Sequence, residues 1–424
     1  MNTNRRKFIT RSAIATAGAL LLPRLGSGNN YTDLSGVPAT DDENFWRLVR
    51  NNFPLDDKIS YLNNGTMGPS PYSVIESQYT TMLEVDRTGK YGGWEDAVPA
   101  LARFTGCKDD EICLTRNVTE GINIVCWGLD LKKGDEVIIT NHEHVGNALP
   151  WLNRAKIDGI VLKVLQLADT AAENLNRINA LITKKTRVIA VPHIPCTQGQ
   201  ILPAKEICTL AKEKGIYSFI DGAHGPGMLV LDLNDMGCDF YASCCHKWML
   251  GPKGTGFLYV KHEKLNDIQA KWVGGYCDTG WSLLSNPPEL KGYVDNAHRY
   301  YYGSMSAPLY KGVVAAVEFH ELIGREKINQ RITALASHFY KRMQELEGKV
   351  VLTTPAEAMS RGSVVSFTMP SLPGEEFTGI ANKAGMRLRY VPENGLNFHR
   401  VSFHIYNTFE EADKLADLVA QSVK

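Results

Sequence analysis

The sequence predicts an α/β fold with a mostly parallel sheet, followed by a smaller α+β domain. Its strand-like runs "GDEVIIT", "TRVIAVPHI" and "GIYSFID" are nearly continuous in apolar residues, as expected for a sheet that helices cover on both faces. A helix pattern lies between the last two runs, so this stretch forms a βαβ unit. From Ala307 the pattern changes to a long helical stretch with short strands after it, which indicates the second domain.

The elements of the predicted sheet carry recognisable start and stop signals. In "PAKEICTLAKEKG", Pro203 suits the first turn of a helix and Gly215 ends it. A further pair of strand-like runs, "CDFYASCC" and "GTGFLYV", flanks Lys247. The three runs named first occupy residues 134–140, 186–194 and 215–221.

The second domain has strand-like runs of its own. "VVLTT", "GSVVSFTMP" and "HRVSFHIY" alternate with helical stretches towards the end of the chain. We therefore expect a large domain at residues 42–306 and a small domain at residues 307–424.

The first 30 residues are of a different kind and precede both domains. Arg5 and Arg6 stand ahead of an apolar run that extends from Ala13 to Leu22 and ends at Pro23. This run is well below the roughly 20 residues that span a bilayer, so an export signal is favoured over a membrane anchor. The pattern predicts twin-arginine export of the folded protein to the periplasm, with no membrane segment in the mature form.

Composition and charge indicate a soluble globular enzyme with a small-molecule or peptide substrate. Hydrophobic residues make up 44% and charged residues 22% of the 424 residues, which excludes a mostly disordered chain. Lys plus Arg and Asp plus Glu both number 46, so the charge balance gives no sign of a nucleic-acid partner. The nine cysteines are an odd number scattered through apolar segments, and they do not form a secreted disulfide framework.

Two residues at the ends of predicted strands suggest the chemistry. Asp221 closes a buried strand, and Lys247 follows another strand 26 residues later. Alone, the aspartate would be a structural hydrogen-bond acceptor and the lysine a surface residue. Together they supply what pyridoxal phosphate requires, namely an amine for a Schiff base and a carboxylate for the ring nitrogen.

A phosphate site and an aromatic contact can be placed as well. Thr119 opens an apolar helix, whose free N–H groups and dipole favour an anion. In "TNHEHVGN", His142, Glu143 and His144 could be read as metal ligands. Alternate residues of an extended segment point in opposite directions and no further ligand follows, so we expect no metal and one imidazole stacked over a ring.

The chain resembles the class V aminotransferase family. The segments "YLNNGTMGPSP", "LTRNVTEGINIV", "GQILPAKEI", "FIDGAH" and "CHKWMLGPKG" occur in the family's order from about Asp42 to the C-terminus. That group includes cysteine desulfurases, kynureninases and isopenicillin N epimerase-like proteins, and "CHKWMLGPKG" is most similar to the epimerase-like branch. The resemblance implies the fold-type I architecture with a seven-stranded sheet, and a homodimer with shared active sites.

The resemblance also implies roles around the cofactor ring. Lys247 matches the Schiff-base lysine and Asp221 the partner of the ring nitrogen. His144 matches the imidazole that stacks on the ring, and His224 matches a residue beside the phenolic oxygen. Cys196 stands where desulfurases have an asparagine near that oxygen, so this contact departs from the family pattern.

The phosphate and substrate contacts follow in the same way. The resemblance assigns the phosphate to the Val118 amide, Thr119, His246 and the edge residue Cys244. Gly303 and Ser304 match a loop that reaches the phosphate of the neighbouring subunit.

For the substrate, Asn64 lies in the segment that borders it. Arg389 aligns with the arginine that binds the substrate α-carboxylate as a bidentate fork. Arg400 is the other candidate for that contact, with a structural role favoured for it.

The reaction type is predicted mainly from one loop in which this sequence differs from the cysteine desulfurases. The desulfurase loop that carries a nucleophilic cysteine reads "RYVPENGLNFHR" here, which disfavours cysteine desulfuration. We expect epimerase-like chemistry at the α-carbon of an amino acid or a peptide-linked amino acid. One alternative is an aminotransferase or a carbon–sulfur or β-elimination lyase of the same family, including an enzyme that modifies side chains of a periplasmic peptide or siderophore. A further alternative is a non-catalytic cofactor-binding protein.

Overall fold

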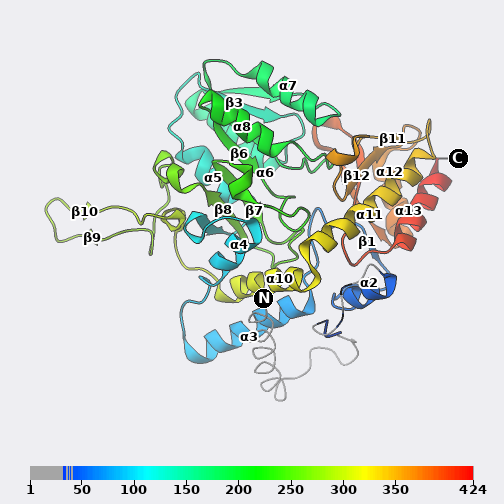
Figure 1. Cartoon of the computed structure of the whole chain (residues 1–424), viewed down its shortest axis with the longest axis horizontal. Helices are drawn as coiled ribbons and strands as arrows, with labels where there is room; N and C mark the ends of the chain where they lie inside the picture. Colours follow the sequence, from blue (N-terminus) through cyan, green and yellow to red (C-terminus); the bar gives the residue numbers. More distant parts are fainter. Residues whose placement is uncertain (1–31, 35–36, 38, 40–41, 424) are drawn as a thin grey trace.

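A seven-stranded sheet forms the centre of the larger part of the molecule (Figure 1). The computed structural model describes residues 32–34, 37, 39 and 42–423, so the predicted signal at residues 1–30 lies outside the described residues. The strand order is β2-β8-β7-β6-β5-β3-β4, and only β8 runs against its neighbours. The expectation of a mostly parallel sheet is therefore confirmed. The strands are β2 (Ile112–Thr115), β3 (Glu136–Thr140), β4 (Val161–Leu165), β5 (Thr186–Pro192), β6 (Tyr217–Asp221), β7 (Phe240–Cys244) and β8 (Gly256–Val260).

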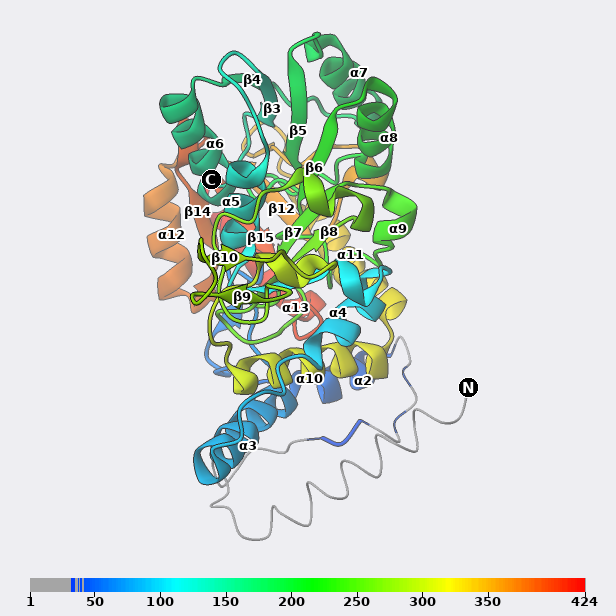
Figure 2. The same cartoon turned by 90° about the vertical axis from the view of Figure 1, so that its left-hand side faces the viewer.

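Helices cover the sheet, as the continuous apolar runs of its strands predict. One pair, α5 (Val118–Gly128) and α6 (Val145–Asp158), packs together, and a second pair, α7 (Ala171–Leu181) and α8 (Ala204–Lys214), lies on the other side of the strands (Figure 2). The short helix α9 (Leu233–Met236) follows β6. Strands β2, β3, β7 and β8 are buried along their whole length, whereas the edge strand β4 is partly exposed.

Long helices connect the sheet with the rest of the chain. Helix α10 (Ala307–Ile323) packs against α3 (Tyr72–Thr88) and α4 (Ala97–Thr105). Tyr310, Val313 and Val317 of α10 join the hydrophobic core of the large sheet, although the sequence pattern counts this helix with the small domain. Helix α11 (Arg325–Gln344) then leads to the second sheet.

The second sheet is antiparallel and has its own hydrophobic core. Its order is β11-β12-β15-β14, and α11, α12 (Gly374–Lys383) and α13 (Phe409–Ser422) contact its strands or one another. The strands are β11 (Val351–Leu352), β12 (Val364–Thr368), β14 (Arg389–Val391) and β15 (Phe398–Ser402). Short 3-10 turns occur at η2 (Asp109–Glu111), η3 (His262–Asp267), η4 (Ala297–Tyr300), η5 (Ala358–Ser360) and η6 (Glu393–Gly395).

The N-terminal segment runs along the second sheet rather than the first. After α2 (Glu43–Arg50), strand β1 (Ser60–Tyr61) pairs in parallel with β13 (Met386–Arg387). Asn63 then bridges to Ser402 at the end of β15. This pairing carries the segment that contains Asn64 across to the arginines of the small domain.

A long arm leaves the body of the molecule between η3 and η4. It contains the two-stranded hairpin of β9 (Trp281–Ser282) and β10 (Glu289–Leu290), which projects well beyond the other elements (Figure 1). Within the described part of the chain, no helix combines the length and the apolar content that crossing a membrane requires.

Candidate active site

The ends of neighbouring parallel strands bring Lys247 and Asp221 to one edge of the large sheet. Asp221 is the last residue of β6 and pairs with Ala242 of β7, and Lys247 follows β7. Ligands bind at this edge of open α/β sheets. Asp221 is 5% exposed. Burial raises the pKa of its carboxyl. The Ala223 amide, which donates to Oδ1 at 2.9 Å, and the nearby Lys247 oppose this rise.

His224 contacts the amine of Lys247 directly. Its Nε2 lies 3.2 Å from Lys247 Nζ, while the indole Nε1 of Trp248 donates to its Nδ1 at 3.0 Å. Burial lowers the pKa of His224 well below its usual range, and the charge of Lys247 adds to this. The neutral ring therefore carries its proton on Nε2, because Nδ1 accepts from the indole. This proton points at Lys247 Nζ, and an amine accepts such a hydrogen bond only in its uncharged form, which is the form that makes a Schiff base.

His144 is a neutral ring within electrostatic reach of the same amine. It caps α6, because its Nδ1 accepts from the Gly146 amide at 3.0 Å. Burial lowers the pKa of His144 to about 4, with additional effects from Lys247, Arg389 and Arg400. A neutral imidazole held in this way suits stacking on an aromatic ring.

A set of unused donors lies at the start of α5. Asn117 caps this helix through Oδ1, which accepts from the Glu120 amide at 2.9 Å. Gly146 allows the starts of α5 and α6 to approach, since a Cβ there would lie 2.6 Å from Thr119 Oγ1. Among the described residues, Nδ1 of His246 is buried without a hydrogen-bond partner. Amides, a hydroxyl and an unpaired imidazole nitrogen are the groups that hold a phosphate.

These features fit pyridoxal phosphate. The donors at Val118, Thr119 and His246 suit its phosphate, the buried Asp221 suits its ring nitrogen, and Lys247 supplies the amine.

Glu143 is a buried carboxyl behind these residues, and the sequence pattern gave it no role beyond a rejected metal site. Its Oε1 accepts from the amide and the hydroxyl of Thr140 at 2.9 Å each, and its Oε2 accepts from Asn147 Nδ2 at 2.8 Å. Burial raises the pKa of Glu143 to about 7. The hydrogen bonds from Asn147 and Thr140 oppose this rise, and the carboxylate of Asp221 adds to it. Only the residues "EHVGN" as a unit could have indicated this network.

Replacing Glu143 with glutamine should flatten the pH dependence of stability in the cofactor-free protein. The folded state holds the Glu143 proton up to about pH 7, whereas an unfolded glutamate releases it near its ordinary pKa of 4.5. Folding therefore takes up a proton between these values, and stability falls as the pH rises through this window, by at most about 3 kcal/mol. Urea unfolding of wild type and Glu143→Gln at pH 5 and pH 8 measures this. Equal slopes in both proteins would contradict the assignment.

The two candidate arginines differ in their partners. Arg389 forms an ion pair with Glu393, which follows four residues later. Arg400 is fully buried, and its Nη2 donates to Asn63 Oδ1 at 3.0 Å and to Thr66 Oγ1 at 2.6 Å. Among the described residues none forms an ion pair with Arg400, and its Nε has no partner. Burial lowers the pKa of Arg400 to about 10, so the guanidinium remains charged at neutral pH.

Asn64 and the two cysteines of the prediction lie nearby. Asn64 Oδ1 accepts from the hydroxyl of Tyr406 at 3.0 Å, while its Nδ2 is buried with no partner in the described chain. The backbone oxygen of Cys196 accepts from Arg400 Nη1 at 2.9 Å. Cys244 Sγ lies 3.7 Å from the Ala223 oxygen, and burial raises the pKa of its thiol.

Gly303 and Ser304 are exposed, and no contact in the described residues joins them to Lys247. Their predicted role towards a neighbouring subunit stays a prediction. No group of three or more His, Cys, Asp or Glu side chains in residues 42–423 is arranged to hold a metal ion.

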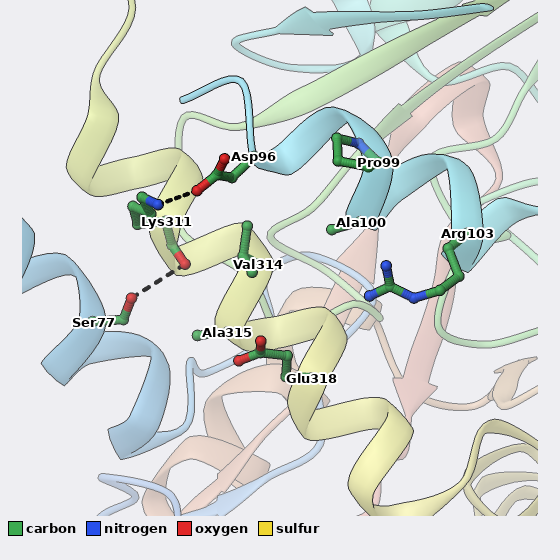
Figure 3. Close-up of a pocket in the computed structure, with 9 residues that line it drawn as sticks. All are labelled: Ser77, Asp96, Pro99, Ala100, Arg103, Lys311, Val314, Ala315 and Glu318. Carbon is green, nitrogen blue, oxygen red and sulfur yellow. Dashed lines mark hydrogen bonds and ion pairs between the residues drawn. The ribbon is translucent and has the colours of Figure 1, made fainter. Parts of the chain in front are cut away.

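A cavity of about 400 Å³ lies between α3, α4 and α10 (Figure 3). Its lysine, Lys311, already forms an ion pair with Asp96, and Arg103 forms one with Glu321. It contains none of the predicted site residues.

Comparison with known proteins shows which family the chain belongs to. The model of the family "Aminotransferase class-V" matches residues 87–415. A cysteine desulfurase of Haloferax volcanii is 31% identical over 77% of this chain and 78% of its own length. An isopenicillin N epimerase of Streptomyces clavuligerus is 28% identical over 88% of this chain and 97% of its own.

Solved structures agree with this assignment. The cystine C–S lyase C-DES, in complex with its reaction product cysteine persulfide, matches 86% of this chain and 98% of its own, with a TM-score of 0.79 and 26% identity. A lysine-to-alanine mutant of C-DES with glycine covalently linked to the PLP cofactor matches 88% of this chain and 98% of its own, with a TM-score of 0.80 and 26% identity. The chain described here therefore belongs to the class V aminotransferase family and is a pyridoxal-phosphate-dependent enzyme of the fold-type I architecture.

Proposed function

We propose that this enzyme acts at the α-carbon of an amino acid or a peptide-linked amino acid, removing and returning the α-proton as an epimerase does. The observation that carries the proposal is the setting of Lys247, whose amine lies against a neutral histidine with no reactive thiol in contact. The segment between Arg389 and Arg400 contains no cysteine. The thiol of Cys244 is buried with a raised pKa, which keeps it in its unreactive form.

In this proposal some residues of the chain bind the cofactor and one, Lys247, transfers the proton. When bound, pyridoxal phosphate supplies an electron sink for the bond that breaks at the α-carbon. Val118, Thr119 and His246 would hold its phosphate, Asp221 would pair with the ring nitrogen and His144 would lie over the ring. Lys247 Nζ would then take the proton from the α-carbon, and inversion requires that a proton returns on the opposite face of that carbon.

Arg400 binds the substrate α-carboxylate in this proposal. Its guanidinium is charged, desolvated and free of any ion pair in the described residues, whereas Glu393 already neutralises Arg389. A desolvated guanidinium without a counter-ion gains from a carboxylate, and its unpartnered Nε is the donor left to bind one of the oxygens. Asn64, with its unpartnered Nδ2, is placed to donate to the same substrate.

We also propose that the enzyme works in the periplasm as a homodimer. Support for export comes from Arg5, Arg6 and the short apolar run after them. Support for the dimer comes from the exposed Gly303 and Ser304, which match a loop that serves the neighbouring subunit in the family.

A carbon–sulfur lyase is the second candidate, and one observation favours it. A desulfurase with a protein-bound sulfur needs a reactive cysteine, and none of the described cysteines near Lys247 fits that role. A lyase that releases its sulfur product needs proton removal at the α-carbon and departure of the sulfur substituent from the β-carbon, without a thiol of the enzyme. The structural similarity to C-DES, a cystine C–S lyase, supports this alternative.

Proton exchange in deuterium oxide separates these reactions. With a panel of L- and D-amino acids and their peptide-linked forms, the proposal expects deuterium at the α-carbon and formation of both configurations, followed by NMR and chiral chromatography. Release of pyruvate with a sulfur product would instead identify a lyase, and amino-group transfer with a keto acid would identify an aminotransferase. Absence of exchange together with an unchanged cofactor spectrum would leave a binding protein.

A further inference from the structure

A cleft of about 490 Å³ opens beside the candidate carboxylate site. Its polar lining includes Asn63, Thr66, Asn382, Arg387, Arg389 and Tyr390, and no acidic residue lines it. The volume lies within the roughly 300–1,000 Å³ of pockets that take drug-sized ligands, which are larger than one small amino acid. The cleft is therefore both roomy and positively charged.

Hydrogen bonds connect this cleft with the catalytic centre. Asn63 and Thr66 line the cleft, and both accept hydrogen bonds from Arg400. Tyr61 lies between the two regions: burial raises the pKa of its hydroxyl, and Arg387 and Arg400 both oppose that rise. A ligand whose carboxylate binds Arg400 would thus extend along the cleft towards Arg387.

Arg387 differs from the other arginines of the site. It stands in β13 opposite Tyr61 of β1, and its side chain is exposed along the cleft. Arg387 and Arg389 both line the cleft. Arg389 has Glu393 as its counter-ion, whereas no ion pair of Arg387 occurs within the described residues. The cleft therefore offers one cation that is not neutralised.

Building on the proposed function, we propose that the substrate carries a second anionic group at its far end and that Arg387 binds this group. The substrate class is then an extended amino acid or small peptide with a carboxylate beyond the reacting end. Arg400 fixes the α-carboxylate, the cleft holds the connecting chain, and Arg387 selects for the distal charge. Two anchoring points at opposite ends would fix the α-carbon in front of Lys247.

A matched pair of probes tests this inference. γ-Glutamylglycine carries a distal carboxylate, and its C-terminal amide has the same length without that charge. Calorimetry gives the dissociation constant of each probe, and deuterium exchange at the α-carbon gives kcat/KM. We expect wild type to prefer the carboxylate roughly fivefold, as suits a partly exposed ion pair.

Three variants assign the preference to Arg387. Arg387→Gln should bring the carboxylate-to-amide ratio close to one, mainly through KM, while Arg387→Lys should keep most of it. Lys383→Gln is the control, because Lys383 is an exposed cation of the preceding helix that does not line the cleft. This control should retain the full preference.

The outcomes distinguish this inference from the proposed function. Equal binding of carboxylate and amide by wild type, or a preference that persists in Arg387→Gln, would overturn the inference. Weak binding of both probes would overturn it too. A calorimetric preference that depends on Arg387 without any α-proton exchange would support the inference and refute the epimerase-like function.

Discussion

Replacing Lys247 with alanine should abolish α-proton exchange and remove the visible absorbance of the lysine-linked cofactor. General acid–base groups contribute about 10²–10⁴-fold to rate, so we expect a loss of at least about 10³-fold in kcat. The fold should remain intact, because Lys247 is only partly buried and its amine has one hydrogen-bond partner among the described residues, His224. The free energy of unfolding of the cofactor-free variant should change by no more than about 0.5 kcal/mol. Absorbance spectra, exchange rates and urea unfolding measure the three effects.

Lys261→Ala is the matched control for this experiment. Lys261 follows β8 directly and forms an ion pair with Glu263, away from the predicted site. Its removal should leave the absorbance and the exchange unchanged. Retention of the absorbance band in Lys247→Ala would show that another amine holds the cofactor.

Replacing Arg400 with lysine should cost about 10²-fold in kcat/KM, mostly through a higher KM. Lysine keeps a positive charge and fills much of the space, but it loses the planar fork that binds a carboxylate through two hydrogen bonds. Disrupting a desolvated charge pair of this kind costs roughly 2–5 kcal/mol. Because Arg400 also bonds to Asn63, Thr66 and the Cys196 backbone, thermal unfolding must accompany the kinetics.

Arg389→Lys provides the comparison that decides between the two arginines. Its ion pair with Glu393 is only partly buried, so the substitution should lower kcat/KM by less than about tenfold. If Arg389→Lys loses more activity than Arg400→Lys, the α-carboxylate contact belongs to Arg389. Equal losses with equal KM values would mean that neither arginine binds the carboxylate alone.

Much of the fold could be predicted because its signals are local. The runs that form β3, β5 and β6 are nearly continuous in apolar residues, since parallel strands are buried on both faces. Pro203 and Gly215 flank α8 as expected, with Gly215 in the left-handed conformation at φ 67°. The domain to which helix α10 belongs could not be predicted in this way, because its apolar residues do not reveal which core they join.

The catalytic centre could also be inferred from short stretches. Asp221 ends strand β6 and Lys247 follows strand β7 within a few residues, and neighbouring parallel strands end at the same edge of the sheet. Local order along the chain therefore determined the position of both groups, and pairing of β6 with β7 brought them together.

What the sequence by itself determined is the set of chemical groups and the elements that carry them: the α/β sheet, the lysine, the carboxylate and the helix start for the phosphate. Only the tertiary structure decided which arginine lacks a counter-ion among the described residues, which carboxyl has its pKa raised, and where the cleft lies. Arg400 and its partner Asn63 are 337 residues apart, and β1 pairs with β13 across almost the same separation. Desolvation and ion pairing depend on such distant neighbours, and these neighbours become known only when the chain is folded.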